Sequence, residues 1–65
     1  MTIILNGEKR EVAASVLADA LVELGYGSAC VATAVNGDFV AAARRVSTVL
    51  SAGDAIEVVA PRQGG

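Results

Sequence analysis

The first part of the chain alternates strand-forming residues with turn signals and predicts a β-hairpin. Residues 2–6 are rich in isoleucine and leucine, and Asn6-Gly7 closes them. Asn-Gly is the strongest short hairpin signal, because both residues tolerate the positive φ angles of a type I′ turn. The return strand is expected over residues 9–13, whose charged positions suit an edge strand, since charge discourages pairing between molecules.

An apolar stripe after this hairpin predicts an amphipathic helix. The stripe has the spacing i, i+3, i+4 and i+7 and consists of Leu17, Ala20, Leu21 and Leu24. Ser15 is the expected N-cap, and Gly25 is the expected glycine after the last turn. Asp19 and Glu23 fall on the opposite face as a like-charge pair. That face is interpreted as solvated, with a docking surface as the alternative.

The second half of the chain predicts another pair of strands. Residues 30–35 read as a strand that ends at the turn signal of residues 36–38. Residues 39–40 are expected to form a short return strand. Residues 41–45 are ambiguous, because alanine and arginine favour a helix but no apolar stripe appears.

The last strand is predicted over residues 55–60, after a turn at residues 51–54. Its two faces carry Ile56 and Val58 on one side and Glu57 and Val59 on the other. Val49 and Leu50 are expected to pack into the core and so hold the segment that follows residue 40.

This order of elements predicts an α+β fold with one main helix packed on one face of a mixed sheet of four to five strands. If the last strand inserts beside the first, the fold is the β-grasp, or ubiquitin-like, fold. Residues 1–60 are expected to form a single domain, and residues 61–65 a flexible tail that ends in Gly-Gly.

Composition and charge exclude several functions. Hydrophobic residues make up 54% of the 65 residues and charged residues 18%, which is typical of a globular chain. The net charge of −2 argues against nucleic-acid binding, which needs a basic surface. No apolar run approaches the roughly 18 residues of a membrane span, and no signal peptide is recognisable. A lone cysteine excludes an internal disulfide, so a reducing cytoplasm is the expected location.

The residue types in the chain do not support a conventional catalytic site. The chain has no histidine and one cysteine, so a histidine base, a histidine metal site and a Cys–His nucleophile are excluded. Cys30 is interpreted as a small buried hydrophobic residue. The carboxylates near the predicted turns are interpreted as turn-formers or solvated charges rather than as an acid–base pair. They are Glu8, Glu11, Asp38 and Asp54.

The tail carries the remaining chemical candidate, which is the carboxylate of Gly65. A carboxylate is a poor acyl donor until an oxygen becomes a leaving group, so it must enter the active site of an activating enzyme. Glycine has no side chain and can therefore enter a narrow tunnel in the enzyme. Pro61 keeps the tail from pairing as a strand. Residues 61–65 reach at most roughly 17 Å when extended. Recognition by the enzyme is expected at Arg62, Gln63 and Gly64. The simpler alternative is that the C-terminal residues are an ordinary flexible end with no part in the chemistry.

The ordered set of these segments resembles the ThiS family, the sulfur carriers of thiamin-thiazole synthesis. The matching segments are residues 4–8, 16–24, 31–40 and 53–59 and the terminal Gly64-Gly65. One departure is Ala41, where family members often have proline.

The resemblance implies a β-grasp fold and a carrier that is not itself an enzyme. A ThiF-like adenylating enzyme would use Mg-ATP to form an acyl-adenylate at Gly65. Sulfur from a persulfide protein would displace AMP and leave a thiocarboxylate, which a ThiG-like thiazole synthase would accept. The chain itself would bind no cofactor and no metal. Phe39 is a candidate for the docking surface, although placement in the core is preferred.

Two other functions stay open from the sequence. One keeps the chemistry and changes the pathway: a MoaD-like small subunit of molybdopterin synthase, or a carrier for cysteine synthesis. The short length favours ThiS over these. The other is a ubiquitin-like adaptor that binds without covalent chemistry, and tagging of other proteins is a further variant. The free chain is expected to be a monomer.

Overall fold

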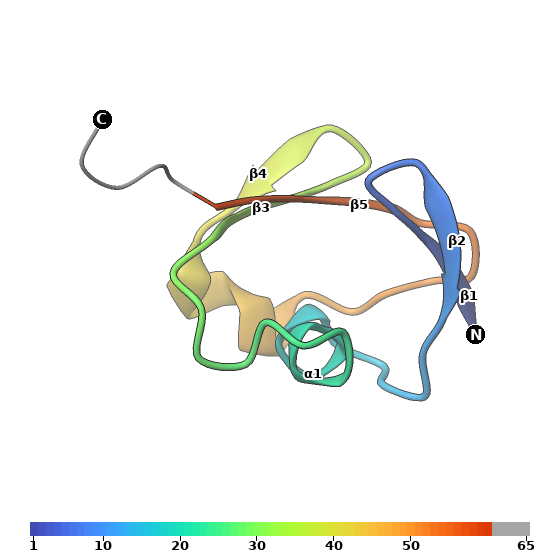
Figure 1. Cartoon of the computed structure of the whole chain (residues 1–65), viewed down its shortest axis with the longest axis horizontal. Helices are drawn as coiled ribbons and strands as arrows, with labels where there is room; N and C mark the ends of the chain where they lie inside the picture. Colours follow the sequence, from blue (N-terminus) through green and yellow to red (C-terminus); the bar gives the residue numbers. More distant parts are fainter. Residues whose placement is uncertain (61–65) are drawn as a thin grey trace.

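The computed structural model describes residues 1–60 and consists of a five-stranded sheet that curves over an α-helix and a short 3₁₀ helix (Figure 1). The strand order is β2-β1-β5-β3-β4, with β1 and β5 parallel and the other neighbours antiparallel. The last strand therefore lies beside the first, and the predicted β-grasp arrangement is confirmed. The elements are β1 (Thr2–Leu5), β2 (Glu8–Glu11), α1 (Leu17–Glu23), β3 (Ala32–Val35), β4 (Asp38–Val40), the 3₁₀ helix η1 (Ala42–Ser47) and β5 (Ala55–Val59).

The β1–β2 hairpin forms at the predicted Asn-Gly pair. Leu5 faces Glu8 across a two-residue loop in which Asn6 has φ 48° and Gly7 has φ 86°. Positive φ at both loop positions is what a type I′ turn requires. Strand β2 is exposed along its whole length, as expected for a charged edge strand.

Helix α1 ends as predicted but begins differently. Gly25 has φ +95° and donates its N–H to the carbonyl of Val22, while the N–H of Tyr26 bonds to the carbonyl of Leu21. These two bonds form the Schellman motif, which favours glycine at this position. The prediction of Ser15 as N-cap is wrong. The cap position is Val16, which makes no side-chain capping bond.

The missing side-chain cap is replaced by a carbonyl from another part of the chain. The N–H of Leu17 donates to the carbonyl of Thr48 at 2.9 Å, and the N–H of Leu50 donates to the carbonyl of Ser15 at 2.9 Å. The start of α1 is therefore held by the segment that precedes β5. The carbonyl of Thr48 thus bonds to one of the free N–H groups at the helix start, which the side chain of Ser15 was expected to bond.

The second half of the chain differs from prediction at two places, and one ambiguous segment takes a definite form. Strand β3 begins at Ala32, two residues later than predicted, and leaves Cys30 outside the strand. The ambiguous segment after β4 forms η1. Leu50 is buried, as predicted, but Val49 is 71% exposed, because only one side chain of the pair points into the core.

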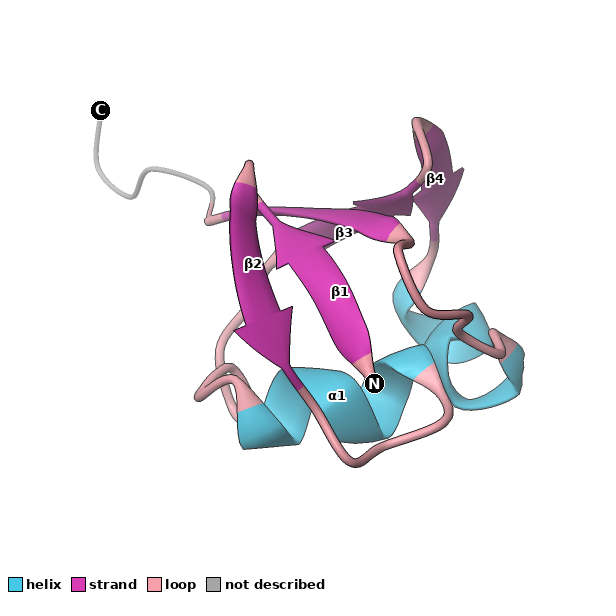
Figure 2. Ribbon diagram, turned by 90° about the vertical axis from the view of Figure 1, so that its right-hand side faces the viewer, coloured by secondary structure: helices cyan, strands magenta, loops and turns pink. Residues whose placement is uncertain are grey.

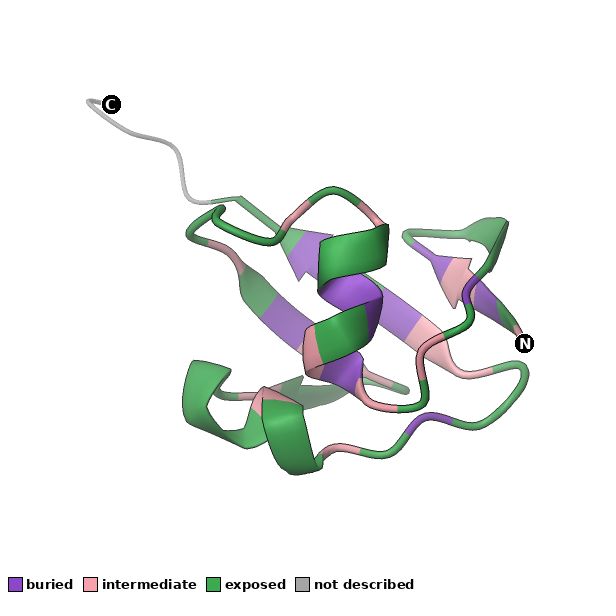
Figure 3. Cartoon of the chain, turned by 90° about the horizontal axis from the view of Figure 1, so that it is seen from below, coloured by how far each residue is buried: buried purple, intermediate pink, exposed green. Residues whose placement is uncertain are grey.

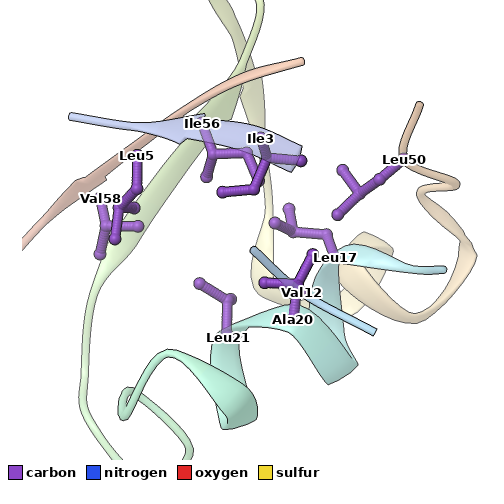
Figure 4. Close-up of a cluster of buried hydrophobic side chains, with 9 residues drawn as sticks. All are labelled: Ile3, Leu5, Val12, Leu17, Ala20, Leu21, Leu50, Ile56 and Val58. Carbon is purple, nitrogen blue, oxygen red and sulfur yellow. The ribbon is translucent and has the colours of Figure 1, made fainter. Parts of the chain in front are cut away.

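The core lies between the inner face of the sheet and α1 (Figures 2 and 3). Strands β1 and β5 bury alternate residues, and the predicted stripe of α1 packs against them (Figure 4). The buried hydrophobic residues are Ile3, Leu5, Val12, Leu17, Ala20, Leu21, Leu50, Ile56 and Val58. Glu57 and Val59 are exposed on the opposite face of β5, as the alternation predicted.

Candidate functional site

The predicted site residues of the tail, Arg62, Gln63, Gly64 and Gly65, lie outside the residues that the structure describes. So does the predicted tail as a segment. The described chain ends at Ala60, directly after β5, which is the central strand of the sheet. What the structure provides is therefore the base of the tail and the surfaces around it.

The base of the tail is held on the β3 side by regular strand pairing. Val58 pairs with Thr33 and Val59 pairs with Ala32, so this ladder reaches the last residue of β5. The side chain of Val58 is buried in the core. The C-terminal end of β5 is thus fixed by one neighbouring strand and by the packing beneath it.

On the β1 side the pairing ends earlier, and a side chain continues it. The last β1–β5 pair is Leu5 with Ile56, and the N–H of Asn6 still donates to the carbonyl of Ile56 at 2.9 Å. The chain then turns away. The side-chain amide of Asn6 accepts from the N–H of Val58 at 2.9 Å and donates to its carbonyl at 3.2 Å.

Asn36 makes a similar arrangement at the other end of β5. Its Oδ1 accepts from the N–H of Ala55 at 2.9 Å, and its Nδ2 donates to Oδ1 of Asp54 at 3.0 Å. The sequence showed both Asn-Gly pairs as turns, but nothing in the pattern indicated that their amides hold β5. Both asparagines have positive φ, and in both the side-chain amide reaches across to β5.

The outer face of the sheet presents an apolar surface near the base of the tail. Phe39 is 74% exposed, and Val59 is 63% exposed. They flank a shallow hollow of about 170 Å³ that is lined by Ala32, Thr33, Ala34, Phe39, Glu57 and Val59. The interpretation of Phe39 as a core residue is wrong. Phe39 faces Ala34, which also pairs with Glu57 on the exposed side of β5, so Phe39 lies on the face away from α1.

Two of the turn carboxylates stabilise local structure. The pKa of Glu11 is lowered, first by the hydrogen bond from the Thr2 hydroxyl at 2.7 Å and then by the N-terminal amine. The pKa of Asp54 is lowered by the backbone N–H of Ser51 at 2.8 Å and by the amide of Asn36. Both shifts arise because hydrogen bonds to the ionised form favour it.

Glu23 has a role that neither interpretation of its helix face included. Its two carboxylate oxygens accept from the N–H groups of Ala13 and Ala14, at 2.9 and 2.7 Å. Glu23 therefore holds the loop between β2 and α1. The contact spans nine to ten residues of sequence, and no local pattern signals it.

Cys30 is exposed in the loop before β3, so its interpretation as a buried hydrophobic residue is wrong. The prediction failed because the strand was expected to start at Cys30. Within residues 1–60, no group of three or more histidine, cysteine or acidic side chains is arranged to hold a metal ion. In the same range, no helix is long and apolar enough to cross a membrane.

Comparisons with known proteins agree with this architecture. A family model described as "ThiS family" matches residues 3–65. The structure is similar to the crystal structure of a thiamine biosynthesis protein (ThiS) from Geobacter metallireducens, with a TM-score of 0.84 and 25% sequence identity over 100% of both chains. A search of curated proteins finds no match.

Proposed function

The chain belongs to the ThiS family, and from this premise we propose that it is a sulfur carrier of thiamin biosynthesis whose reacting group is the carboxylate of Gly65. The chain acts as a co-substrate, and its partners are the catalysts. They are an adenylating enzyme of the ThiF type, a thiazole synthase of the ThiG type and a protein that supplies persulfide sulfur. The adenylating enzyme holds the Mg-ATP.

The proposed chemistry proceeds in three steps. The Gly65 carboxylate attacks the α-phosphorus of ATP, releases pyrophosphate and becomes an acyl-adenylate. The terminal sulfur of a protein persulfide attacks the acyl carbon, and AMP leaves with the electrons of the broken C–O bond. The product is an acyl disulfide. A thiol then attacks the sulfur of the donor protein, which forms a disulfide with the donor and releases the Gly65 thiocarboxylate.

The observation that carries this proposal is the family match, which extends from β1 through the diglycine at residues 64–65. The described structure supports it, because the central strand β5 leads directly to the tail. A tail of five residues reaches at most roughly 17 Å beyond Ala60. The globular part must therefore dock close to the entrance of the active site.

The surface best suited to this docking is the hollow between Phe39 and Val59. It lies on the outer face of the sheet, and Val59 is the last residue of β5. Exposed aromatic and aliphatic side chains around a shallow hollow are the features of a protein-binding surface. An enzyme that covers Phe39 would thus also lie against the base of the tail. Recognition of Arg62, Gln63 and Gly64 belongs to the same proposal.

Intact mass spectrometry tests the proposal directly. The full chain is incubated with the adenylating enzyme of the same organism, Mg-ATP and a persulfide donor. The expected product has exchanged one oxygen atom for sulfur, and fragmentation places the change on Gly65. A persulfide on Cys30 would instead add sulfur without loss of oxygen, so the two modifications are distinguished by mass.

Two variants serve as controls for this experiment. A chain without Gly65 and a chain extended by one alanine should form no thiocarboxylate at Gly65, because neither presents the same terminal carboxylate. An unchanged wild-type mass with an enzyme shown to be active would refute the sulfur-carrier function and favour the non-covalent adaptor. An adaptor would tolerate the added alanine without loss of partner binding.

A further inference from the structure

The C-terminal end of β5 depends on a single side chain on its β1 side. Strand β1 pairs with β5 only as far as Leu5 and Ile56. Beyond that point, among the described residues, the amide of Asn6 supplies both the acceptor and the donor that face Val58. The amide supplies the acceptor and the donor that backbone groups would supply if β1 continued as a strand.

Chain geometry explains why a side chain is needed there. A parallel neighbour would continue the ladder with its own N–H and C=O groups. The chain instead turns at Asn6, which has φ 48°, and Gly7 returns it into β2. A primary amide carries one acceptor and two donor hydrogens, so Asn6 can replace both missing backbone groups at once. The two bonds are partly buried, which limits competition from water.

We infer that Asn6 is a positioning residue for the carrier reaction, because it fixes the last residues of β5 from which the reacting tail leaves. This inference rests on the proposed function. Val58 is two residues before Ala60 and adjoins Val59, which belongs to the proposed docking surface. Loss of the Asn6 bonds would therefore loosen the docking surface and the base of the tail together.

The expected kinetic consequence follows from the limited reach of the tail. If the end of β5 frays, only a fraction of the molecules presents Val59 and the tail correctly. The apparent affinity for the enzyme then falls to that fraction of its full value. Chemistry within the correctly bound complex is unchanged. We therefore expect a raised KM for the carrier with a nearly unchanged kcat.

The chain offers a matched control in Asn36. Both asparagines precede glycine in a hairpin loop, both have positive φ, and the amide oxygen of each accepts an N–H of β5. They differ in position, because Asn36 bonds at Ala55, at the start of β5. Glycine tolerates the positive φ of these sites, so Asn6→Gly and Asn36→Gly remove the amides without adding backbone strain.

The experiment measures adenylation of the full-length wild type and both variants as a function of carrier concentration. Asn6→Gly should raise KM roughly threefold or more, while kcat stays nearly unchanged and Asn36→Gly behaves as wild type. Asn6→Asp keeps an acceptor for the N–H of Val58 but sets a carboxylate oxygen against the carbonyl of Val58, so it should also raise KM above that of the wild type. Equal KM values for the two glycine variants would overturn the inference.

Amide hydrogen exchange on the free chain separates this inference from the proposed function. The amide of Val59, to which Asn6 makes no hydrogen bond, should exchange faster in Asn6→Gly than in Asn36→Gly. If the wild type forms neither adenylate nor thiocarboxylate, the carrier function is refuted. The exchange comparison then decides whether Asn6 fixes the end of β5, and equal exchange of Val59 in both variants would overturn that as well.

Discussion

Nε of Arg45 lies 3.0 Å from the hydroxyl oxygen of Thr33, the one buried polar side chain among residues 1–60. The same hydroxyl donates to the carbonyl of Val40 at 2.8 Å, and Nη2 of Arg45 donates to the carbonyl of Val31 at 2.6 Å. Thr33 thus links β3, β4 and η1. A buried hydroxyl is favourable here because both its donor and its acceptor capacity are used.

Replacement of Thr33 by valine should therefore destabilise the chain. The shape is nearly kept, but the carbonyl of Val40 and Nε of Arg45 lose their partner, which typically costs about 1–3 kcal/mol. Thr48→Val is the matched control, because the Thr48 hydroxyl bonds to the carbonyl of Arg44 at an exposed site. Urea denaturation measures both. Equal stabilities of the two variants would show that the Thr33 bonds contribute little.

The success of the sequence-based fold prediction follows from the local character of its signals. The two Asn-Gly turns, the glycine after α1 and the alternation along β5 each act through a few neighbouring residues, and each appears in the structure. The Ser15 prediction failed because the carbonyl of Thr48 reaches the helix start from a distant part of the chain. The exposure of Glu23 agrees with the solvated face that was predicted, but its bonds to Ala13 and Ala14 were not foreseen, and Cys30 was wrongly expected to be buried. Both depend on loops that no local pattern describes.

In the candidate site, too, the features that depend on neighbouring residues could be predicted and those that depend on distant residues could not. The strand before the tail could be predicted, because it has a clear alternation. The diglycine is read directly from the sequence, and its role stays a prediction. The side of the sheet on which Phe39 lies could not be predicted, because a three-residue edge strand has too few positions to show which face is buried. The role of Asn6 was equally hidden, since its partner Val58 is 52 residues away.

Glu23→Gln should reduce stability although Glu23 is exposed. Glutamine has one side-chain oxygen, so it can accept from only one of the N–H groups of Ala13 and Ala14. Its NH₂ group then faces the other N–H, and two donors cannot bond to each other. A loss of about 1 kcal/mol is expected from this single unmet bond. Asp19→Asn on the same helix should change stability by less than about 0.5 kcal/mol. Thermal unfolding of both variants at neutral pH decides, and identical midpoints would contradict the prediction.

Asp54 should make stability depend on acid pH. Its pKa in the folded chain lies below its ordinary value of 3.8, because the N–H of Ser51 and the amide of Asn36 favour the carboxylate. The stabilisation is therefore fully present above the ordinary pKa and is lost as the pH falls through the lower folded pKa. The free energy of unfolding of wild type and Asp54→Asn should differ at pH 6, and the difference should shrink as the pH falls below the ordinary pKa of 3.8 and through the lower folded pKa.

Glu11→Gln provides the comparison for this pH series, because the pKa of Glu11 is lowered by other partners, Thr2 and the N-terminal amine. A chain with both substitutions should show less acid dependence than either single variant. A constant difference between wild type and Asp54→Asn across the whole pH range would show that the ionisation of Asp54 has no part in stability.

Cys30→Ala should leave both sulfur transfer and stability unchanged. The side chain is exposed, so its removal creates no cavity in the core. The proposed chemistry uses the thiol of a partner and not that of Cys30. Thiocarboxylate formation is followed by intact mass, and stability by urea denaturation with a change below about 0.5 kcal/mol expected. A variant that folds normally but gains no sulfur would give Cys30 a part in the reaction.

Phe39→Thr should impair activation without affecting the fold. Phe39 is 74% exposed, so its replacement removes little buried area, and threonine keeps a residue that suits a strand. If the adenylating enzyme covers this side chain, the KM for the carrier should rise roughly tenfold or more, as for a central aromatic residue of an interface. Val49→Thr is the matched control, because Val49 is 71% exposed but lies beside the start of α1 rather than on the outer face of the sheet. Its KM should equal that of the wild type. A raised KM for Val49→Thr with an unaffected Phe39→Thr would place the docking surface on the helix side of the molecule.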